Sequence, residues 1–243
     1  MAPNNQETEQ QGLMSLLEHL FELKDHLVRI AIALIVASVA TFAFSKQILI
    51  LLLRPMQRYE GQYQIQATTP TTTIGVWMKI ALFSGAIVAM PFIVYQIGRF
   101  VTPGLTKRER RYLYILVPGA TLCFLTGVAF AYFVMLPAAL PFLGSFMADL
   151  IEQNWAIGEY LSFVTSLLFW IGVAFELPLF VYFLAKAGVI DAQTLSKNRK
   201  YAVIAIAFLS AVITPTVDPL NMALVMGPLI VLYEIGVILA RIA

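Results

Sequence analysis

Long apolar stretches separated by shorter polar ones dominate the pattern along the 243-residue chain. Four of them have about 20 or more residues, enough to cross the ~30 Å hydrocarbon core of a bilayer. Two further stretches follow near the C-terminus. The six predicted spans cover residues 27–53, 76–100, 112–136, 160–185, 201–213 and 222–240. The pattern therefore predicts an all-α polytopic membrane protein with one six-helix domain over residues 13–243.

The last two predicted helices are short. The stretch YAVIAIAFLSAVI has thirteen residues before Thr214, about 20 Å of helix at ~1.5 Å per residue. Gly227-Pro228 interrupts the sixth stretch. Because basic residues flank this pair of stretches, we expect a helical hairpin that spans a locally thinned bilayer.

Composition and charge agree with a membrane protein. Hydrophobic residues make up 60% of the chain and charged residues only 12%, against about 25% charged in soluble domains. Twelve of the sixteen Lys and Arg residues fall on one side of the predicted membrane, which places both termini in the cytoplasm. Residues 1–12 are polar and predict a disordered cytoplasmic tail. The two long outward loops, 54–75 and 137–158, predict short interfacial helices.

One acid interrupts the fourth predicted span. Glu176 lies in GVAFELPLFVY, and an ionised carboxylate at that depth is costly unless it faces a polar cavity or partner. Pro178 removes a backbone donor, so we expect a kink nearby. Glu176 could serve a functional polar patch, or a protonated Glu176 could hydrogen-bond a neighbouring span.

Other acids have both structural and functional interpretations. Glu22 lies on an amphipathic helix at the membrane interface, either on a solvated face or at a binding site. Glu109 lies among Lys and Arg in KRERR, either in a topology-setting loop or presented to a cationic partner. Asp218 could cap the last helix, and Glu234 could reach the interface.

Several function classes have no support in the sequence. The net charge of +2 gives no argument for nucleic acid, and the two histidines are not part of a metal-binding pattern. Nucleotide-binding and catalytic signatures are absent. We therefore expect neither an enzyme nor a cofactor or metal site.

Motifs along nearly the whole chain carry a family resemblance. They are HLFELKDHL (19–27), PFIVYQIGRFVTPGL (91–105), KRERR (107–111), GVAFAYFVMLP (127–137), YLSFVTSLLFWIGVAFELP (160–178), AGVID (187–191), ITPTVDP (213–219) and LYEIGV (232–237). In this order and spacing they resemble TatC, the multispanning receptor subunit of the twin-arginine protein translocase.

The resemblance implies a fold and a function. The fold would have six spans, a concave face and both termini in the cytoplasm of a prokaryotic plasma (inner) membrane. The protein would bind Arg-Arg signal peptides of folded cargo and form a multimeric complex with single-span TatA or TatB partners. Export would be driven by the proton gradient.

The resemblance also assigns residues to two sites. The signal-peptide site would contain Glu22, Glu109, Lys24, Leu20, Pro91 and Phe100. The partner-helix docking site would contain Glu176, Thr214, Asp218 and Gln96. Carboxylates suit the first role because they accept both branches of a guanidinium. Where the family usually has Glu-Leu-Arg-x-Arg, this chain has Lys24 and His26, so the arginine fork geometry is lost.

Two alternatives belong to other classes. A small proton-coupled secondary transporter would use Glu176 and Asp218 as coupled sites, in keeping with acids and broken helices inside the membrane. A purely structural scaffold would bind single-span partners without affinity for signal peptides. Solute uptake by the purified protein would favour the transporter.

Overall fold

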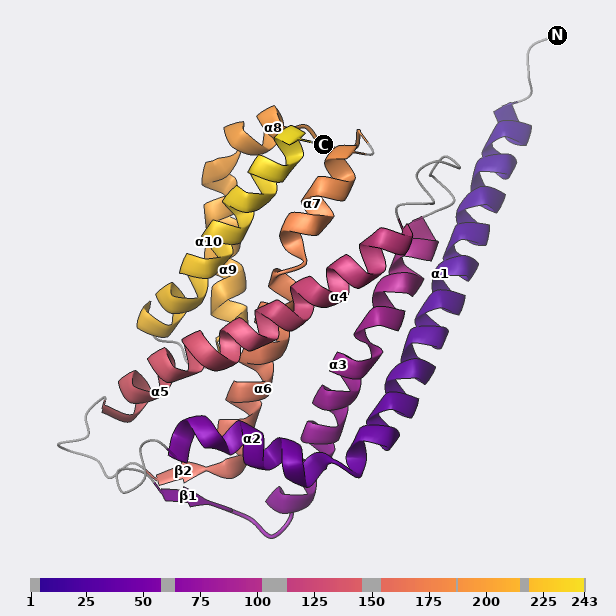
Figure 1. Ribbon diagram of the computed structural model, residues 1–243. Coiled ribbons are helices and arrows are strands. Elements are labelled where there is room, and N and C mark those ends of the chain that lie inside the picture. Colours follow the sequence, from indigo (N-terminus) through magenta and orange to yellow (C-terminus); the bar gives the residue numbers. More distant parts are fainter. Residues whose placement is uncertain are drawn as a thin grey trace.

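The computed structural model describes residues 5–57, 64–101, 113–145, 154–186, 188–214 and 219–242, which are almost entirely helical (Figure 1). The helices are α1 (Asn5–Phe42), α2 (Ser45–Gln57), α3 (Thr72–Val101), α4 (Leu113–Phe130), the π-helical segment Ala131–Met135, α5 (Leu136–Ser145), α6 (Ile157–Ala174), α7 (Leu177–Lys186), α8 (Ala192–Lys197), α9 (Arg199–Ile213) and α10 (Pro219–Ile242). Two short strands complete the described elements, β1 (Gln64–Gln66) and β2 (Asn154–Ala156).

Five helical stretches in this part of the chain are long and apolar enough to cross a membrane. They are Leu20–Phe42, Thr72–Phe100, Val117–Ser145, Ile157–Lys186 and Asn221–Ile242. Helix α9, with 15 residues, is shorter. The predicted all-α polytopic class is confirmed. In Figure 1 the N-terminal end of α1 and the C-terminal ends of α3, α7 and α10 point to one end of the bundle, here called the terminal end; α2 and the strands lie at the other.

The first predicted span, 27–53, is wrong in its extent. A turn at Ala43-Phe44 ends α1, and α2 runs across the end of the bundle (Figure 1). Leu52 and Met56 of α2 are buried, whereas Arg54 is exposed. Helix α2 is therefore amphipathic and suited to a membrane interface. Because its apolar residues follow those of α1 directly in the sequence, the predicted first span continued too far, to residue 53.

Other boundaries also differ from the sequence prediction. The third helical stretch continues through the π-helical segment to Ser145. Helix α10 has 24 residues and continues through Pro228, so the sixth helix is not short; neighbouring groups in a membrane bundle can satisfy the backbone that a proline frees. Residues 5–12, predicted to belong to a disordered tail over 1–12, are helical instead, because α1 begins at Asn5. The segment Asn5–Gln11 is rich in Glu and Gln, which favour helix.

The strands were not predicted. β1 and β2 pair in parallel, with Gln64, Ile65 and Gln66 opposite Asn154, Trp155 and Ala156. Both come from the loops that predicted only interfacial helices. The pairing joins the segment before α3 to the segment before α6.

Helix α1 packs mainly along α3, and only 6% of its apolar span is buried. Thr41 Oγ1 donates a hydrogen bond to the Ala81 carbonyl of α3 at 3.1 Å. Farther along, a Cβ built on Gly85 would lie 2.6 Å from the Ser38 backbone nitrogen. Small residues thus let the two backbones approach closely, as is common between membrane helices.

Helices α4 and α6 meet at a second close contact. A Cβ on Gly127 would lie 2.9 Å from both the Gly172 Cα and the Ile171 carbonyl oxygen. These are backbone atoms, so they cannot move aside as a side-chain end could. Gly119, on the same helix, has only a Leu179 methyl at 3.8 Å.

We predict that Gly127→Ala pushes α4 and α6 apart and lowers the free energy of unfolding by about 1–3 kcal/mol. Thermal unfolding of the purified protein in detergent measures this effect. Gly119→Ala is the matched control and should be neutral or stabilising by up to ~1 kcal/mol, because alanine favours helix over glycine. Equal unfolding midpoints for the two variants would contradict the close-packing argument.

Candidate functional site

A surface of mixed charged and apolar side chains lies on α1 near the terminal end of the bundle. Leu20, Phe21, Glu22 and Lys24 are all exposed there. Lys24 Nζ lies 3.9 Å from Asp25 Oδ1 and 5.7 Å from the Phe21 ring centroid. Because the Lys24 and Asp25 side chains are 67% and 61% exposed, this ion pair adds little stability. Both side chains therefore remain accessible to a ligand.

A partly buried pair of polar side chains positions this part of α1 against α3. His26 Nδ1 and Gln96 Oε1 lie 2.7 Å apart, and since an amide oxygen only accepts, the imidazole is the donor. The Phe100 ring lies edge-on to His26, with ring centroids 6.2 Å apart. Gln96 is buried, with 4% of its surface exposed.

The structure therefore places Gln96 with Phe100 and α1, whereas the resemblance assigns it to partner docking with Glu176. The resemblance gave no sign of this pairing. His26 stands at a position where the resemblance implies arginine, and its acceptor lies seventy residues away in the sequence. Only the packing of α1 on α3 brings the two side chains together.

Pro91 and Glu109 are the remaining residues of the predicted signal-peptide site. Pro91 lies half-buried inside the continuous helix α3. Glu109 lies outside the described residues. The structure thus brings Leu20, Glu22, Lys24 and Phe100 to the terminal end of α1 and α3, without testing the predicted pairing of Glu22 with Glu109.

Glu176 lies where α6 ends and α7 begins. The α-helix is interrupted at Phe175-Glu176, before Pro178, so the predicted break is confirmed. Phe175 packs on Phe130 of α4, with centroids 5.5 Å apart. The Glu176 Oε1 atom is buried, and no hydrogen-bond partner for it exists among the described residues. A buried carboxylate oxygen without a partner is costly, so this site favours an incoming donor.

The other predicted docking residues behave differently. Thr214 is buried at the C-terminal end of α9, and its hydroxyl donates to the Ser210 carbonyl at 2.7 Å. It terminates the helix rather than presenting a free hydroxyl. Asp218 lies outside the described residues. Glu234 accepts a hydrogen bond from Arg199 Nη2 at 2.8 Å, a pairing that the sequence analysis did not identify.

A mostly apolar pocket of about 410 Å³, with Lys79 and three hydroxyl side chains in its lining, lies between α1, α3 and α6 and was not predicted. Its lining residues are Leu34, Lys79, Leu82, Phe83, Ala86, Ser162, Thr165, Ser166, Phe169 and Trp170. Lys79 Nζ donates to Ser162 Oγ at 2.5 Å. The sequence signal was present, because Lys79 interrupts an apolar span just as Glu176 does. The pocket therefore combines apolar walls with one lysine that already donates to a hydroxyl of its own lining.

These features define the class of the protein: a polytopic helical membrane protein with charged side chains inside its spans. A family model described as Sec-independent protein translocase protein (TatC) matches residues 18–228. The translocase protein TatC of Deinococcus radiodurans is 38% identical over 93% of this chain and 86% of its own length. The TatC of Aquifex aeolicus is 37% identical over 95% and 96%, respectively. A crystal structure titled twin arginine translocase receptor TatC superposes with a TM-score of 0.83 and 36% identity, covering 92% of this chain and 98% of the other.

The chain belongs to the TatC family. It is an integral membrane protein and a core subunit of the Sec-independent, or twin-arginine, protein translocase. The family membership favours this role over the small-transporter alternative.

We predict that Gln96→Leu loosens the terminal end of α1, because it leaves the His26 N–H without its acceptor. The expected cost is about 1–3 kcal/mol of unfolding free energy, measured by thermal unfolding. Hydrogen exchange in α1 should rise near His26 and not near Thr41.

The double variant His26→Phe/Gln96→Leu provides the control. It replaces both polar partners with apolar groups, so it should cost less than the sum of the two single variants. Simple additivity would show that the 2.7 Å contact does not hold α1 in place.

Proposed function

We propose that the protein is the signal-peptide receptor of its translocase and binds the arginine pair of signal peptides on folded cargo. The exposed Glu22 carboxylate on α1 is the observation that carries this proposal. A guanidinium forms charge-assisted hydrogen bonds with such a carboxylate, and Glu109 supplies a second acceptor. Leu20 and Phe21, both exposed beside Glu22, suit the apolar residues that accompany the arginines.

The same proposal includes assembly and energy supply. Single-span partners of the TatA or TatB type dock a polar residue of their membrane helix at Glu176, and the proton gradient drives export. The buried Glu176 Oε1 atom, unpartnered in the described part of the chain, supports this role. Both termini face the cytoplasm of a prokaryotic inner membrane, in keeping with the basic residues at the terminal end.

The receptor site can be tested with a twin-arginine peptide and the purified protein. Glu22→Gln keeps the size of the side chain but removes the charge, so affinity should fall about tenfold or more. Wild-type protein should show a comparable loss with a Lys-Lys peptide, since lysine lacks the planar fork. Fluorescence anisotropy of a labelled peptide gives the dissociation constants.

Glu159→Gln is the matched control. Glu159 is an exposed acid in the first turn of α6, at the opposite end of the bundle (Figure 1). Removing its charge should change affinity less than about twofold, because screening weakens distant surface charges. Wild-type affinity in both Glu22→Gln and Glu109→Gln would refute the site.

The docking role of Glu176 predicts a separable defect. Glu176→Gln should reduce copurification of single-span partners at least about fivefold, because the charge-assisted bond to the partner helix is lost. Affinity for the signal peptide should stay within about twofold of wild type. Glu234→Gln serves as the control, since Arg199 already occupies that carboxylate. If Glu176→Gln retained its partners, the docking assignment would be wrong.

A further inference from the structure

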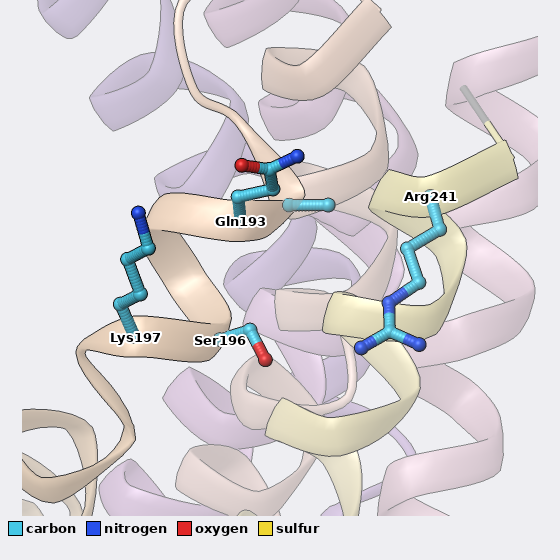
Figure 2. A pocket seen from close by; sticks show the side chains of 5 residues that line it. Gln193, Ser196, Lys197 and Arg241 are labelled. Carbon is cyan, nitrogen blue, oxygen red and sulfur yellow. The ribbon is translucent and has the colours of Figure 1, made fainter.

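A second pocket, here called the α8–α10 pocket, lies at the terminal end, apart from the residues discussed above (Figure 2). Its volume is about 470 Å³, and it is lined by Ala192, Gln193, Ser196, Lys197 and Arg241. Figure 2 shows Ser196 of α8 and Arg241 of α10 on facing sides of it. Ligand sites typically measure ~300–1,000 Å³, so a small polar group fits here.

The charges of the α8–α10 pocket are positive and uncompensated. Lys197 and Arg241 are exposed, and neither forms an ion pair within the described part of the chain. Arg199, nearby in sequence, is instead neutralised by Glu234 at 2.8 Å. Two cations with a hydroxyl and an amide form a donor set that suits a phosphate group.

The level of the pocket relative to the membrane indicates the source of such a phosphate. Arg241 lies one residue before the end of the apolar span Asn221–Ile242, which is the level of lipid headgroups. Exposed apolar side chains run along α10 towards it at helical spacing: Val231, Ile235, Ile238 and Ile242. This stripe can contact an acyl chain while the pocket holds the headgroup.

We propose that the α8–α10 pocket binds the headgroup phosphate of an anionic phospholipid. Arg241 and Ser196, which face each other in Figure 2, contact the phosphate oxygens. Lys197, whose exposed side chain is directed away from Arg241 in Figure 2, turns towards the phosphate when the lipid binds. Gln193 donates to headgroup hydroxyls, and the apolar stripe of α10 contacts one acyl chain. Basic pockets between membrane helices commonly recognise anionic headgroups in this way. The proposal is independent of the signal-peptide and docking roles proposed above.

The test titrates phosphatidylglycerol into the purified full-length protein in a neutral detergent and counts bound lipids by native mass spectrometry. Lys197→Gln/Arg241→Gln should weaken the tightest binding about tenfold or more, given the contribution of each basic residue near a headgroup. Lys186→Gln/Lys200→Gln removes the same charge from exposed lysines that do not line the pocket, and should weaken binding less than about twofold. Phosphatidylcholine should bind at least about tenfold more weakly to the wild-type protein, because it carries no net charge.

Several outcomes decide the proposal. Equal losses in the two double variants would show general surface attraction and overturn it. Complete displacement of phosphatidylglycerol by millimolar inorganic phosphate would assign the pocket to free phosphate and overturn the lipid. If the pocket variant fails to fold, Lys197→Gln alone gives the same test, with an expected loss of about fivefold; unchanged binding there would also refute the site.

Discussion

The attachment of α1 to α3 is the contact on which the position of the candidate signal-peptide site depends. Lipid tails are as apolar as the side chains they replace, so hydrophobic burial gives little force between membrane helices. With only 6% of its span buried, α1 relies instead on close backbone approach and polar contacts. The Ser38–Gly85 approach, the Thr41 hydroxyl and the His26–Gln96 pair are spaced along its length. They hold the exposed side chains around Glu22 in a fixed position relative to Phe100.

The charged groups of the bundle lie at different levels, which suits a subunit that contacts several molecules. Glu22 and Lys24 are exposed at the terminal end, where we propose that the signal peptide binds. Glu176 and Lys79 lie within stretches long and apolar enough to cross a membrane. A hydrogen bond or ion pair within the apolar spans is stronger than one at the terminal end, because less water competes for the same groups. This separation is what the proposed receptor and docking roles require, because each would then use its own surface.

The sequence predicted what depends on composition and single residues, and missed what depends on packing. The all-α polytopic class and the break beside Pro178 followed from hydrophobic runs and one proline. The end of the first span did not, because the buried face of α2 is as apolar as a span and only the turn at Ala43-Phe44 separates them. The His26–Gln96 pair was not predicted, because the two side chains are seventy residues apart in the sequence. Lys79 could have been found by the reasoning that identified Glu176.

The small parallel pairing of β1 with β2 has a consequence for how the chain reaches its final form. The two strands are separated in sequence by α3, α4 and α5, and parallel pairing requires a long crossover between its strands. Here that crossover goes through the membrane and back. The strands can meet only when both of these passages have been completed, since otherwise they would lie on opposite sides of the bilayer. The three residue pairs between β1 and β2 can therefore form only after both passages through the membrane have been inserted correctly.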